Sequence, residues 1–402
     1  MKVLCMLLNG SITNDQRVIR MIDVLSNKVK LDLYYVNAHK EDEMIFNKNI
    51  NLFAFPKKNN LKNKLIQHSF FCREYDFFIN HVLSMNIKYD YIYANDLPTL
   101  RQAYKISRKL NAKLIYDSHE IYIETLNQFF PSKAKGFFLK IIFKTLLSFM
   151  KLHGRSIESK YIRQIDDFIT VNQSLLNYFK KEYKITTGKV IMNLPFKNVT
   201  SEVYDFRKQF KWPENTQIIL YQGSLTKGRG LELLISAVQF LEKRCKLIIL
   251  GDGPLKTDLC LMVNNNGLNE GVKFINKVSI EELSAYTKGA DLGINLLESI
   301  NLSKKLASPN KLFEYIHAEL PVICSYSPEN NLVLEKYKIG LQCHNEIESI
   351  VNRVHELINI NENEKKIIQR DLIKSKEEYC YDNQIKLIED ILDDKQFKII
   401  KA

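Results

Sequence analysis

The hydrophobic pattern alternates along the chain between short apolar runs and longer amphipathic stretches. Runs rich in β-branched and aromatic residues are typical of buried strands, and apolar residues spaced by three and four are typical of helices. In the first half, the predicted strands are 2–8, 31–36, 89–94, 112–117 and 167–171, and the predicted helices are 15–28, 97–110 and 174–183. In the second half, the predicted strands are 216–223, 245–251, 271–275, 290–297 and 320–325, and the predicted helices are 230–243, 255–267 and 279–289.

Strands that alternate with helices favour parallel sheets with helical crossovers. The alternation occurs twice, and residues 193–216 between the halves contain two prolines and no clear period. We therefore expect an α/β protein of two doubly wound, Rossmann-like domains around a central cleft. The predicted domains are 1–195 and 196–376, and 377–402 is predicted to be a C-terminal helix that packs back on the first domain.

The charge is unevenly distributed between the halves. Residues 1–195 carry 30 Lys and Arg against 17 Asp and Glu, a net +13, and the remainder carries 28 against 29. A basic half attracts polyanions or an anionic bilayer, although a solvated basic surface explains the same excess. No nucleic-acid partner is predicted, because no reading motif is present and the charge is spread rather than concentrated on one helix.

Cysteine usage and hydropathy indicate the compartment. The seven cysteines lie far apart and never as C-x-x-C, which favours a reducing cytosol over a disulfide framework. The opening segment lacks the basic leader and cleavage site of a signal peptide, and 137–150 is shorter than the roughly 20 apolar residues of a membrane span. We expect a cytoplasmic protein that contacts the inner face of the cell membrane only peripherally, if at all.

Residues 133–155 are the candidate for such a contact. As one helix, this segment places its cations in a stripe opposite Phe138, Ile142 and Phe149; the cations are Lys133, Lys140, Lys144, Lys151 and Arg155. Two interpretations fit the pattern equally: a helix lying on an anionic bilayer, and a buried helix with a solvated lysine edge.

Loops that follow predicted strands are candidate sites, because ligands of doubly wound sheets bind beyond the carboxyl ends of the strands. Gly10 follows the first strand, and Asn14 or Asp15 is placed to cap the next helix, whose amides could face a phosphate. A routine turn explains the same residues. His119 follows the strand at 112–117, where it can donate a hydrogen bond to a substrate hydroxyl or carry a proton near neutral pH.

Two loops of the second half suit a phosphorylated ligand. Gly223, Gly228 and Gly230 permit a tight backbone around Arg229, a combination that can hold a diphosphate, and the G-K-[ST] ending of a phosphoryl-transfer loop is absent. Ser308 and Pro309 fit the start of a helix, so the next amides, those of Asn310, Lys311 and Leu312, would be free for an anion. Glu314 lies one turn further on, where it would accept hydrogen bonds from a ribose. A plain amphipathic helix with a good cap is the alternative.

Several segments together resemble a known family. Residues 221–237, 247–256, 272–297 and 308–325 resemble the C-terminal half of retaining, nucleotide-sugar-dependent glycosyltransferases of family 4, which have the GT-B fold. Residues 14–25 and 114–122 are similar to the acceptor half of the same family. The resemblance is collinear over essentially the whole chain. The members that it resembles act in bacterial surface-polysaccharide synthesis.

The resemblance implies a role for individual residues. Glu314 matches the second glutamate of the family's E-x7-E motif, which holds the nucleotide ribose, and Arg229 matches a cation that neutralises the donor diphosphate. Gly223 and Gly10 match two opposed glycines near the phosphates, and domain closure would bring Gly10 and His119 over the donor sugar. The loop containing Asn276 matches the one that meets the nucleobase.

Two positions depart from the family pattern. Leu306 stands where the first glutamate of E-x7-E is expected, and Ser224 stands where an arginine is common. Nucleotide binding is still implied, but the donor sugar is not. Lys305 or Lys311 is expected to replace part of the missing contacts.

The resulting expectation is a metal-independent, retaining glycosyltransferase of surface-polysaccharide synthesis (capsule, lipopolysaccharide or exopolysaccharide). Its donor is a nucleotide diphosphate sugar, its acceptor is a saccharide or a lipid-linked saccharide, and no other cofactor is expected. No D-x-D triplet occurs in the chain. The predicted catalytic residues are His119, Arg229 and Lys311, and the predicted donor-binding residues are Gly10, Gly223, Ser224, Asn276, Ser308, Pro309, Asn310, Leu312 and Glu314.

A non-hydrolysing sugar-nucleotide epimerase of the same fold is the alternative. It would need histidine and carboxylate pairs for proton transfer, and only the neighbourhood of His119 and Glu120 offers one.

Overall fold

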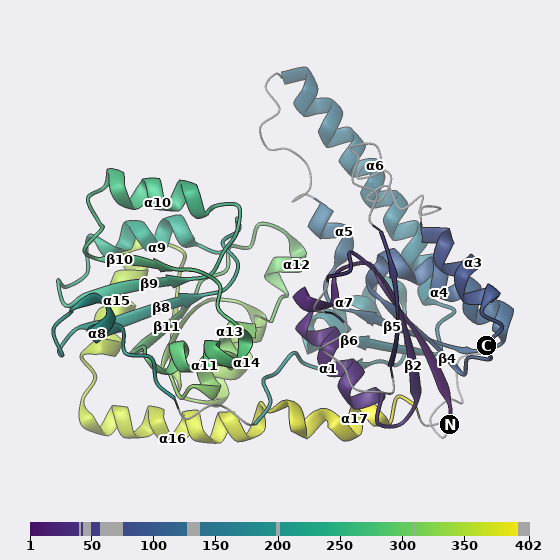
Figure 1. Ribbon diagram of the computed structural model, residues 1–402. Helices are drawn as coiled ribbons and strands as arrows, with labels where there is room; N and C mark the ends of the chain where they lie inside the picture. The colour runs from purple at the N-terminus through teal and green to yellow at the C-terminus, as the bar shows by residue number, and fades with distance from the viewer. Residues whose placement is uncertain are drawn as a thin grey trace. The chain divides into compact units, whose positions relative to one another are not determined.

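The computed structural model describes residues 1–39, 42, 50–56, 75–126, 137–197, 202–308 and 310–392. The chain forms two compact units, each built around its own parallel sheet (Figure 1). Unit 1 comprises Met1–Met192 with Gln384–Ala402, and unit 2 comprises Asn193–Asn383. Along the sequence, the chain passes from unit 1 to unit 2 near the predicted boundary at 195, whereas it returns to unit 1 seven residues later than the predicted boundary at 376.

Unit 1 has a seven-stranded sheet in the order β3-β2-β1-β4-β5-β6-β7. Its strands are β1 (Val3–Leu8), β2 (Lys30–Val36), β3 (Ile50–Phe55), β4 (Tyr91–Asn95), β5 (Lys113–Ser118), β6 (Asp167–Thr170) and β7 (Lys189–Val190). Its helices are α1 (Gln16–Leu25), α3 (Asp76–Ser84), α4 (Asp96–Leu110), α5 (Tyr122–Thr125), α6 (Phe137–Ile162), α7 (Gln173–Tyr183) and α17 (Ile385–Glu389), with a 3-10 turn at Ile12–Asn14.

Unit 2 has a six-stranded sheet in the order β10-β9-β8-β11-β12-β13. Its strands are β8 (Gln217–Gln222), β9 (Cys245–Leu250), β10 (Val272–Ile275), β11 (Leu292–Asn295), β12 (Val322–Ser325) and β13 (Gly340–Cys343). Its helices are α8 (Phe206–Phe210), α9 (Leu231–Val238), α10 (Lys256–Asn265), α11 (Ile280–Lys288), α12 (Leu302–Lys305), α13 (Asn310–His317), α14 (Pro328–Lys336), α15 (Ile347–Ile358) and α16 (Glu362–Glu378).

Both sheets are doubly wound, which confirms the predicted fold class. The strand order reverses between β1 and β4 in unit 1 and between β8 and β11 in unit 2. A crevice forms beyond the carboxyl ends of the strands at such a reversal, and this is where ligands of open parallel sheets bind. The prediction missed β3, β7 and β13, which lie at the edges of the sheets, because edge strands are less buried and their hydrophobic pattern is weaker.

The C-terminal segment is not the single helix that the pattern predicted from 377 onward. α16 ends at Glu378, and a 3-10 turn at Tyr381–Gln384 separates it from α17. The backbone leaves the helix because the amide of Tyr381 donates to the carbonyl of Pro195 and its ring packs on Phe196 at 5.0 Å. Gln384 then exchanges two hydrogen bonds with the backbone of Met192, and Lys28 pairs with Glu389 at 3.4 Å, so α17 packs on unit 1.

Helix α6 differs from the predicted 133–155 helix. It begins at Phe137 and continues to Ile162; Lys133 and the side chains of Phe138 and Lys140 lie outside the described residues. Lys151 and Arg155 bind the carboxylate of Glu124 at 2.8 and 3.0 Å, so these two cations do not form part of a free basic stripe. Among the described residues, no helix has the length and apolar character needed to cross a bilayer.

Candidate functional site

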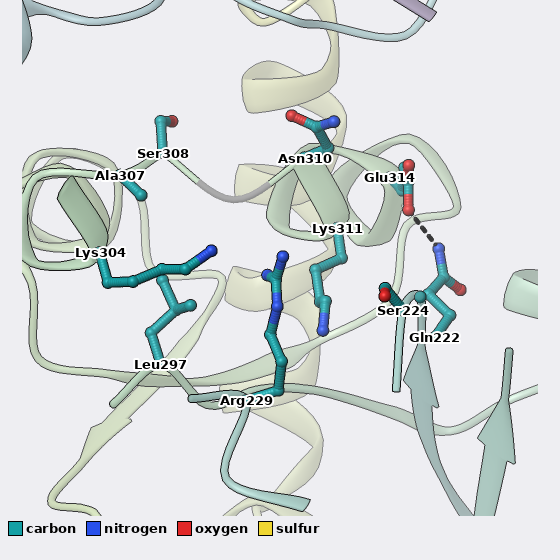
Figure 2. A pocket seen from close by; sticks show the side chains of 11 residues that line it. Gln222, Ser224, Arg229, Leu297, Lys304, Ala307, Ser308, Asn310, Lys311 and Glu314 are labelled. Atoms are coloured by element: carbon teal, nitrogen blue, oxygen red, sulfur yellow. Dashed lines mark hydrogen bonds between the residues drawn. The ribbon is translucent and has the colours of Figure 1, made fainter. Parts of the chain in front are cut away.

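A cavity of about 270 Å³ lies at the carboxyl end of β8 in unit 2, at the point where the strand order reverses. Its lining comes from the end of β8, the loop before α9, the segment after β11, and helices α12 and α13 (Figure 2). The lining residues are Gln222, Gly223, Ser224, Arg229, Leu297, Lys304, Ala307, Ser308, Asn310, Lys311 and Glu314. The cavity therefore gathers residues that are 92 positions apart in the sequence, Gln222 and Glu314.

The amine of Lys311 is buried in this cavity, and Glu314 is the nearby carboxylate that partly offsets its burial. The residue is 6% exposed, and its Nζ makes no hydrogen bond to the described part of the chain. Nζ lies 3.6 Å from the centroid of the Tyr221 ring, whose face attracts a cation. Burial and the nearby Arg229 lower the pKa of Lys311 well below the ordinary value of an amine. An anion in the cavity would supply the missing charge.

Two further cations point into the same space. Arg229 and Lys304 converge with Lys311 from three separate segments (Figure 2). Nε of Arg229 is buried and finds no hydrogen-bond partner among the residues that the structure describes. The first turn of α13 lies beside these side chains, and helix N-termini leave backbone amides without intrahelical partners. The lining is thus strongly electropositive and offers several hydrogen-bond donors to a diphosphate.

Glycine is required where β8 leaves the sheet. Gly223 has φ +124°, in the region that favours glycine, and the Cβ of a larger residue would contact Cε of Lys311 at 3.5 Å. Gly251, after β9, lies so close that an added Cβ would fall 1.9 Å from the carbonyl oxygen of Gly223. These two glycines let the loop after β9 approach closely the loop after β8, which lines the cavity.

Glu314 is held in place by a chain of buried polar side chains. Its Oε2 accepts a hydrogen bond of 2.6 Å from Nε2 of Gln222, and Oε1 of Gln222 accepts one of 2.8 Å from Oγ1 of Thr287. The hydroxyl of Tyr315 donates to the carbonyls of Leu220 and Ile294, which fixes the next turn of α13 against the sheet. Because Gln222 occupies one carboxylate oxygen, the other remains for a ligand hydroxyl.

The remaining predicted residues of unit 2 lie elsewhere. The side chain of Leu312 is 1% exposed and belongs to the core, and Asn276 is exposed and accepts a hydrogen bond from Lys256; neither lines the cavity. Pro309 lies outside the described residues. Lys304, rather than the expected Lys305, faces the cavity, because Lys305 points to solvent on the short helix α12.

Gln222 and Lys304 are the lining residues whose importance the sequence analysis missed. Gln222 is the last residue of a buried strand and directly precedes Gly223, so its position at a carboxyl end was a usable signal. Lys304 carried no such signal, because its place depends on α12, a helix of four residues capped by the side chain of Asn301.

In unit 1, the predicted residue His119 lies at the carboxyl edge of the sheet among three carboxylates. Its Nδ1 is 3.3 Å from Oδ2 of Asp96 and 4.0 Å from Oδ2 of Asp15, and its Nε2 is 3.4 Å from Oδ2 of Asp117. Its backbone amide donates to Oδ1 of Asp96 at 2.9 Å. Burial alone would lower the pKa of the imidazole, but Asp96 and Asp117 outweigh it and raise the pKa to about 9. The raised pKa favours the charged imidazole at neutral pH. Both roles predicted for His119, hydrogen-bond donor and proton carrier, stay predictions.

Asp117 connects His119 to a buried arginine. Nε and Nη2 of Arg17 donate to its two oxygens at 3.1 and 2.7 Å, and the hydroxyl of Tyr93 donates at 2.7 Å. Arg17 and Asp117 are 4% and 0% exposed, and the pKa of the carboxyl is lowered, because the positive charges of Arg17 and His119 outweigh the effect of burial. Arg17 also donates to the carbonyl of Ile191, so the cluster joins β5 to the start of α1 and to the segment that follows β7.

The loop after β1 completes this edge. Asp15, not Asn14, caps α1, because its carboxylate accepts from the amide of Val18 at 3.1 Å. Gly10 lies in the same loop, and an added Cβ there would meet nothing within 4 Å.

Within the described residues, no group of three or more His, Cys, Asp or Glu side chains is arranged to hold a metal ion.

The raised pKa of His119 makes the stability of unit 1 depend on pH. The ion pairs favour folding fully below the unfolded pKa near 6.5, and this stabilisation is lost as pH rises through about 9. We expect the free energy of unfolding to fall by up to about 3 kcal/mol over this window in the wild type and by clearly less in His119→Gln. Urea unfolding at several pH values measures it, with His344→Gln in unit 2 as a control. Equal pH slopes for the wild type and His119→Gln would contradict a charged, paired imidazole.

Residues 203–371 match the family model described as "Glycosyl transferases group 1". The whole cavity lies within this stretch. The chain is also 30% identical to the alpha-D-kanosaminyltransferase of Streptomyces kanamyceticus over 119 residues, which are 25% of this chain and 31% of that protein. It is 25% identical to an uncharacterized glycosyltransferase of Methanocaldococcus jannaschii over 201 residues, 43% of this chain and 50% of that protein. The chain thus matches 31% and 50% of the length of these two curated relatives.

Solved structures match over nearly the whole chain. HepE of Anabaena, crystallised with UDP and glucose, has a TM-score of 0.72 at 15% identity and covers 98% of this chain and 99% of its own. Sucrose-phosphate synthase of Thermosynechococcus elongatus has a TM-score of 0.73 at 13% identity, with 97% and 98% covered. The fold is that of the GT-B glycosyltransferases, as predicted.

Proposed function

We propose that this chain, which has the GT-B fold and carries a glycosyl transferases group 1 region, is a nucleotide-sugar-dependent glycosyltransferase. The observation that carries the proposal is the cavity of unit 2, where Arg229, Lys304 and Lys311 converge beside the start of α13. A diphosphate supplies the negative charge that the buried Lys311 lacks. Gln222 donates a hydrogen bond to one carboxylate oxygen of Glu314, and the other oxygen can accept a hydrogen bond from a ribose hydroxyl at the edge of the three cations.

The chemistry follows from these charges. When the glycosidic bond to the diphosphate breaks, negative charge develops on the leaving phosphate oxygen. Fixed cations and helix amides that face this oxygen stabilise the transition state without reorganising. Arg229 and Lys304 are in this position, and a bound diphosphate would favour the charged form of Lys311 beside them, so the reaction is proposed to be metal-independent. Retention at the anomeric carbon is proposed from the resemblance to family 4 glycosyltransferases. The residue Leu306, which lacks a carboxylate, does not line the cavity and leaves the identity of the sugar open.

The substrates are proposed by class. HepE was crystallised with UDP and with UDP-glucose, so UDP-sugars are the first donors to test. The acceptor is proposed to be a saccharide, free or lipid-linked, in bacterial surface-polysaccharide synthesis; WaaG, of similar fold, is described as a glycosyltransferase involved in lipopolysaccharide biosynthesis. The epimerase alternative would require a histidine that exchanges protons, whereas His119 is committed to Asp96 and Asp117.

A donor panel tests the proposal. The chain is incubated with UDP-, GDP- and ADP-sugars and a saccharide acceptor in the presence of a chelator. We expect release of the nucleoside diphosphate and transfer of the sugar with an unchanged anomeric configuration. Chromatography measures the released nucleotide, and NMR determines the anomeric configuration of the product. An inverted product, strict dependence on a divalent metal, or an epimerised donor formed without acceptor would each contradict the proposal.

A further inference from the structure

Helix α6 exposes a row of large apolar side chains that no described residue of unit 1 covers. We call this row the α6 apolar face; it consists of Ile141, Ile142, Leu146, Phe149 and Leu152, which are 47%, 60%, 39%, 56% and 66% exposed. Their spacing places them on one side of the helix, because residues three, four or seven apart share a face. Single exposed apolar residues are common, but a contiguous group on one helix marks an interaction surface.

The opposite side of α6 packs against the rest of unit 1. Met150 and Glu158 are buried there, at 2% and 1% exposure, and Tyr161 packs its ring on Tyr104 of α4 at 4.9 Å. Lys151 and Arg155 bind Glu124 beside α5. In Figure 1 the C-terminal part of α6 runs along unit 1, while its N-terminal part extends away from the sheet. The α6 apolar face is therefore not needed to hold the helix in place.

The charges of α6 indicate what could cover this face. Its one acidic residue is Glu158, which accepts hydrogen bonds from the hydroxyls of Tyr116 and Tyr183 and is buried. The helix thus presents no carboxylate to solvent. Lys144, three residues after Ile141, lies at the edge of the α6 apolar face and is exposed, and Lys160 is exposed near the end of the helix. Apolar side chains combined with cations and no acid are complementary to an anionic lipid surface.

We propose that the α6 apolar face docks on an anionic bilayer, with its side chains among the acyl chains and Lys144 near the lipid phosphates. The helix lies on such a surface rather than crossing it, in keeping with the absence of a spanning helix among the described residues. A second copy of the chain is a poorer occupant, because two α6 helices would bring like charges together without a carboxylate of α6 between them. The proposal does not depend on the reaction in unit 2.

Vesicle binding by the full chain tests the proposal. We expect it to co-sediment with vesicles of phosphatidylcholine and phosphatidylglycerol at about 7:3, more weakly at high salt, and hardly with phosphatidylcholine alone. The variant Ile142→Ser/Phe149→Ser/Leu152→Ser should bind at least ~10-fold more weakly. Lys144→Glu should lose about 10-fold or more, because it replaces an attraction with a repulsion.

Two controls separate docking from general effects. Leu261→Ser removes a 53% exposed leucine from α10, and Lys109→Glu makes the same charge change on α4; neither should alter binding. Each variant is checked for an unchanged melting temperature. The proposal is overturned if the triple-serine variant binds anionic vesicles as well as the wild type does. It is equally overturned if the wild type ignores both vesicles and light scattering shows a dimer that the triple-serine variant abolishes.

Discussion

Replacing Lys311 with methionine should weaken nucleoside diphosphate binding severely and leave the free protein as stable as before or more stable. The amine is 6% exposed and unpaired in the described structure, so folding bears its desolvation cost without compensation. Methionine has a similar length and no charge, so the empty protein loses only the contact with the Tyr221 ring. A bound diphosphate, by contrast, loses a buried charge-assisted hydrogen bond, and we expect its Kd to rise by ~30-fold or more.

Calorimetric titration and thermal unfolding of the same variant measure the two effects. Lys305→Met is the matched control, because this exposed lysine on the neighbouring helix α12 does not line the cavity. It should change neither quantity appreciably. Full donor affinity in Lys311→Met would show that Lys311 does not bind the donor. A large loss of stability would show instead that the amine is paired in the free protein.

Asp117→Asn should destabilise unit 1 by about 3–5 kcal/mol, the usual cost of removing one partner of a buried ion pair. The carboxylate is fully buried and receives hydrogen bonds from Arg17 and Tyr93 while it also faces His119. The amide is isosteric but neutral, so Arg17 and the imidazole would lose their shared counter-charge. The same change should lower the pKa of His119, because Asp117 is among the groups that raise it.

The control for this prediction is a second arginine–carboxylate pair of unit 1. Arg101 and Asp76 are joined at 2.8 Å but are 16% and 32% exposed, so Asp76→Asn should cost no more than about 1 kcal/mol. Urea unfolding compares the two variants, and NMR titration of the imidazole follows its pKa. If Asp117→Asn were as mild as Asp76→Asn, the cluster would not be the electrostatic centre of this edge of the sheet.

The sequence predicted the fold because both signals that define it are local. Strands such as β1 and β8 are continuous apolar runs, and the helices between them carry a regular apolar stripe. The edge strand β3 escaped notice because half-exposed strands lose that pattern. The break after Glu378 also escaped, because it depends on contacts of Tyr381 with Pro195 and Phe196, which are distant in sequence.

The candidate site was predictable where its residues follow a strand or begin a helix. Gly223, Arg229, Ser308 and Lys311 could be found in this way, and the structure gathers them around one cavity. Chemistry that arises from packing between segments could not be predicted. The lack of a hydrogen bond to the Lys311 amine and the raised pKa of His119 depend on burial and on neighbours that no local pattern contains. For the same reason, the ion pairs of Glu124 with Lys151 and Arg155 of α6 could not be predicted from the sequence.

The central claim is that the cavity of unit 2 binds the diphosphate of a nucleotide sugar through protein cations alone. Calorimetric titration of the wild type with UDP, GDP, ADP and CMP, and then with the monophosphate of the base that binds best, in a chelating buffer tests it most directly. We predict that one nucleoside diphosphate binds far more tightly than CMP and that Lys311→Met abolishes this preference. The account would be contradicted if no diphosphate bound without a divalent metal, or if mono- and diphosphates of the preferred base bound equally well.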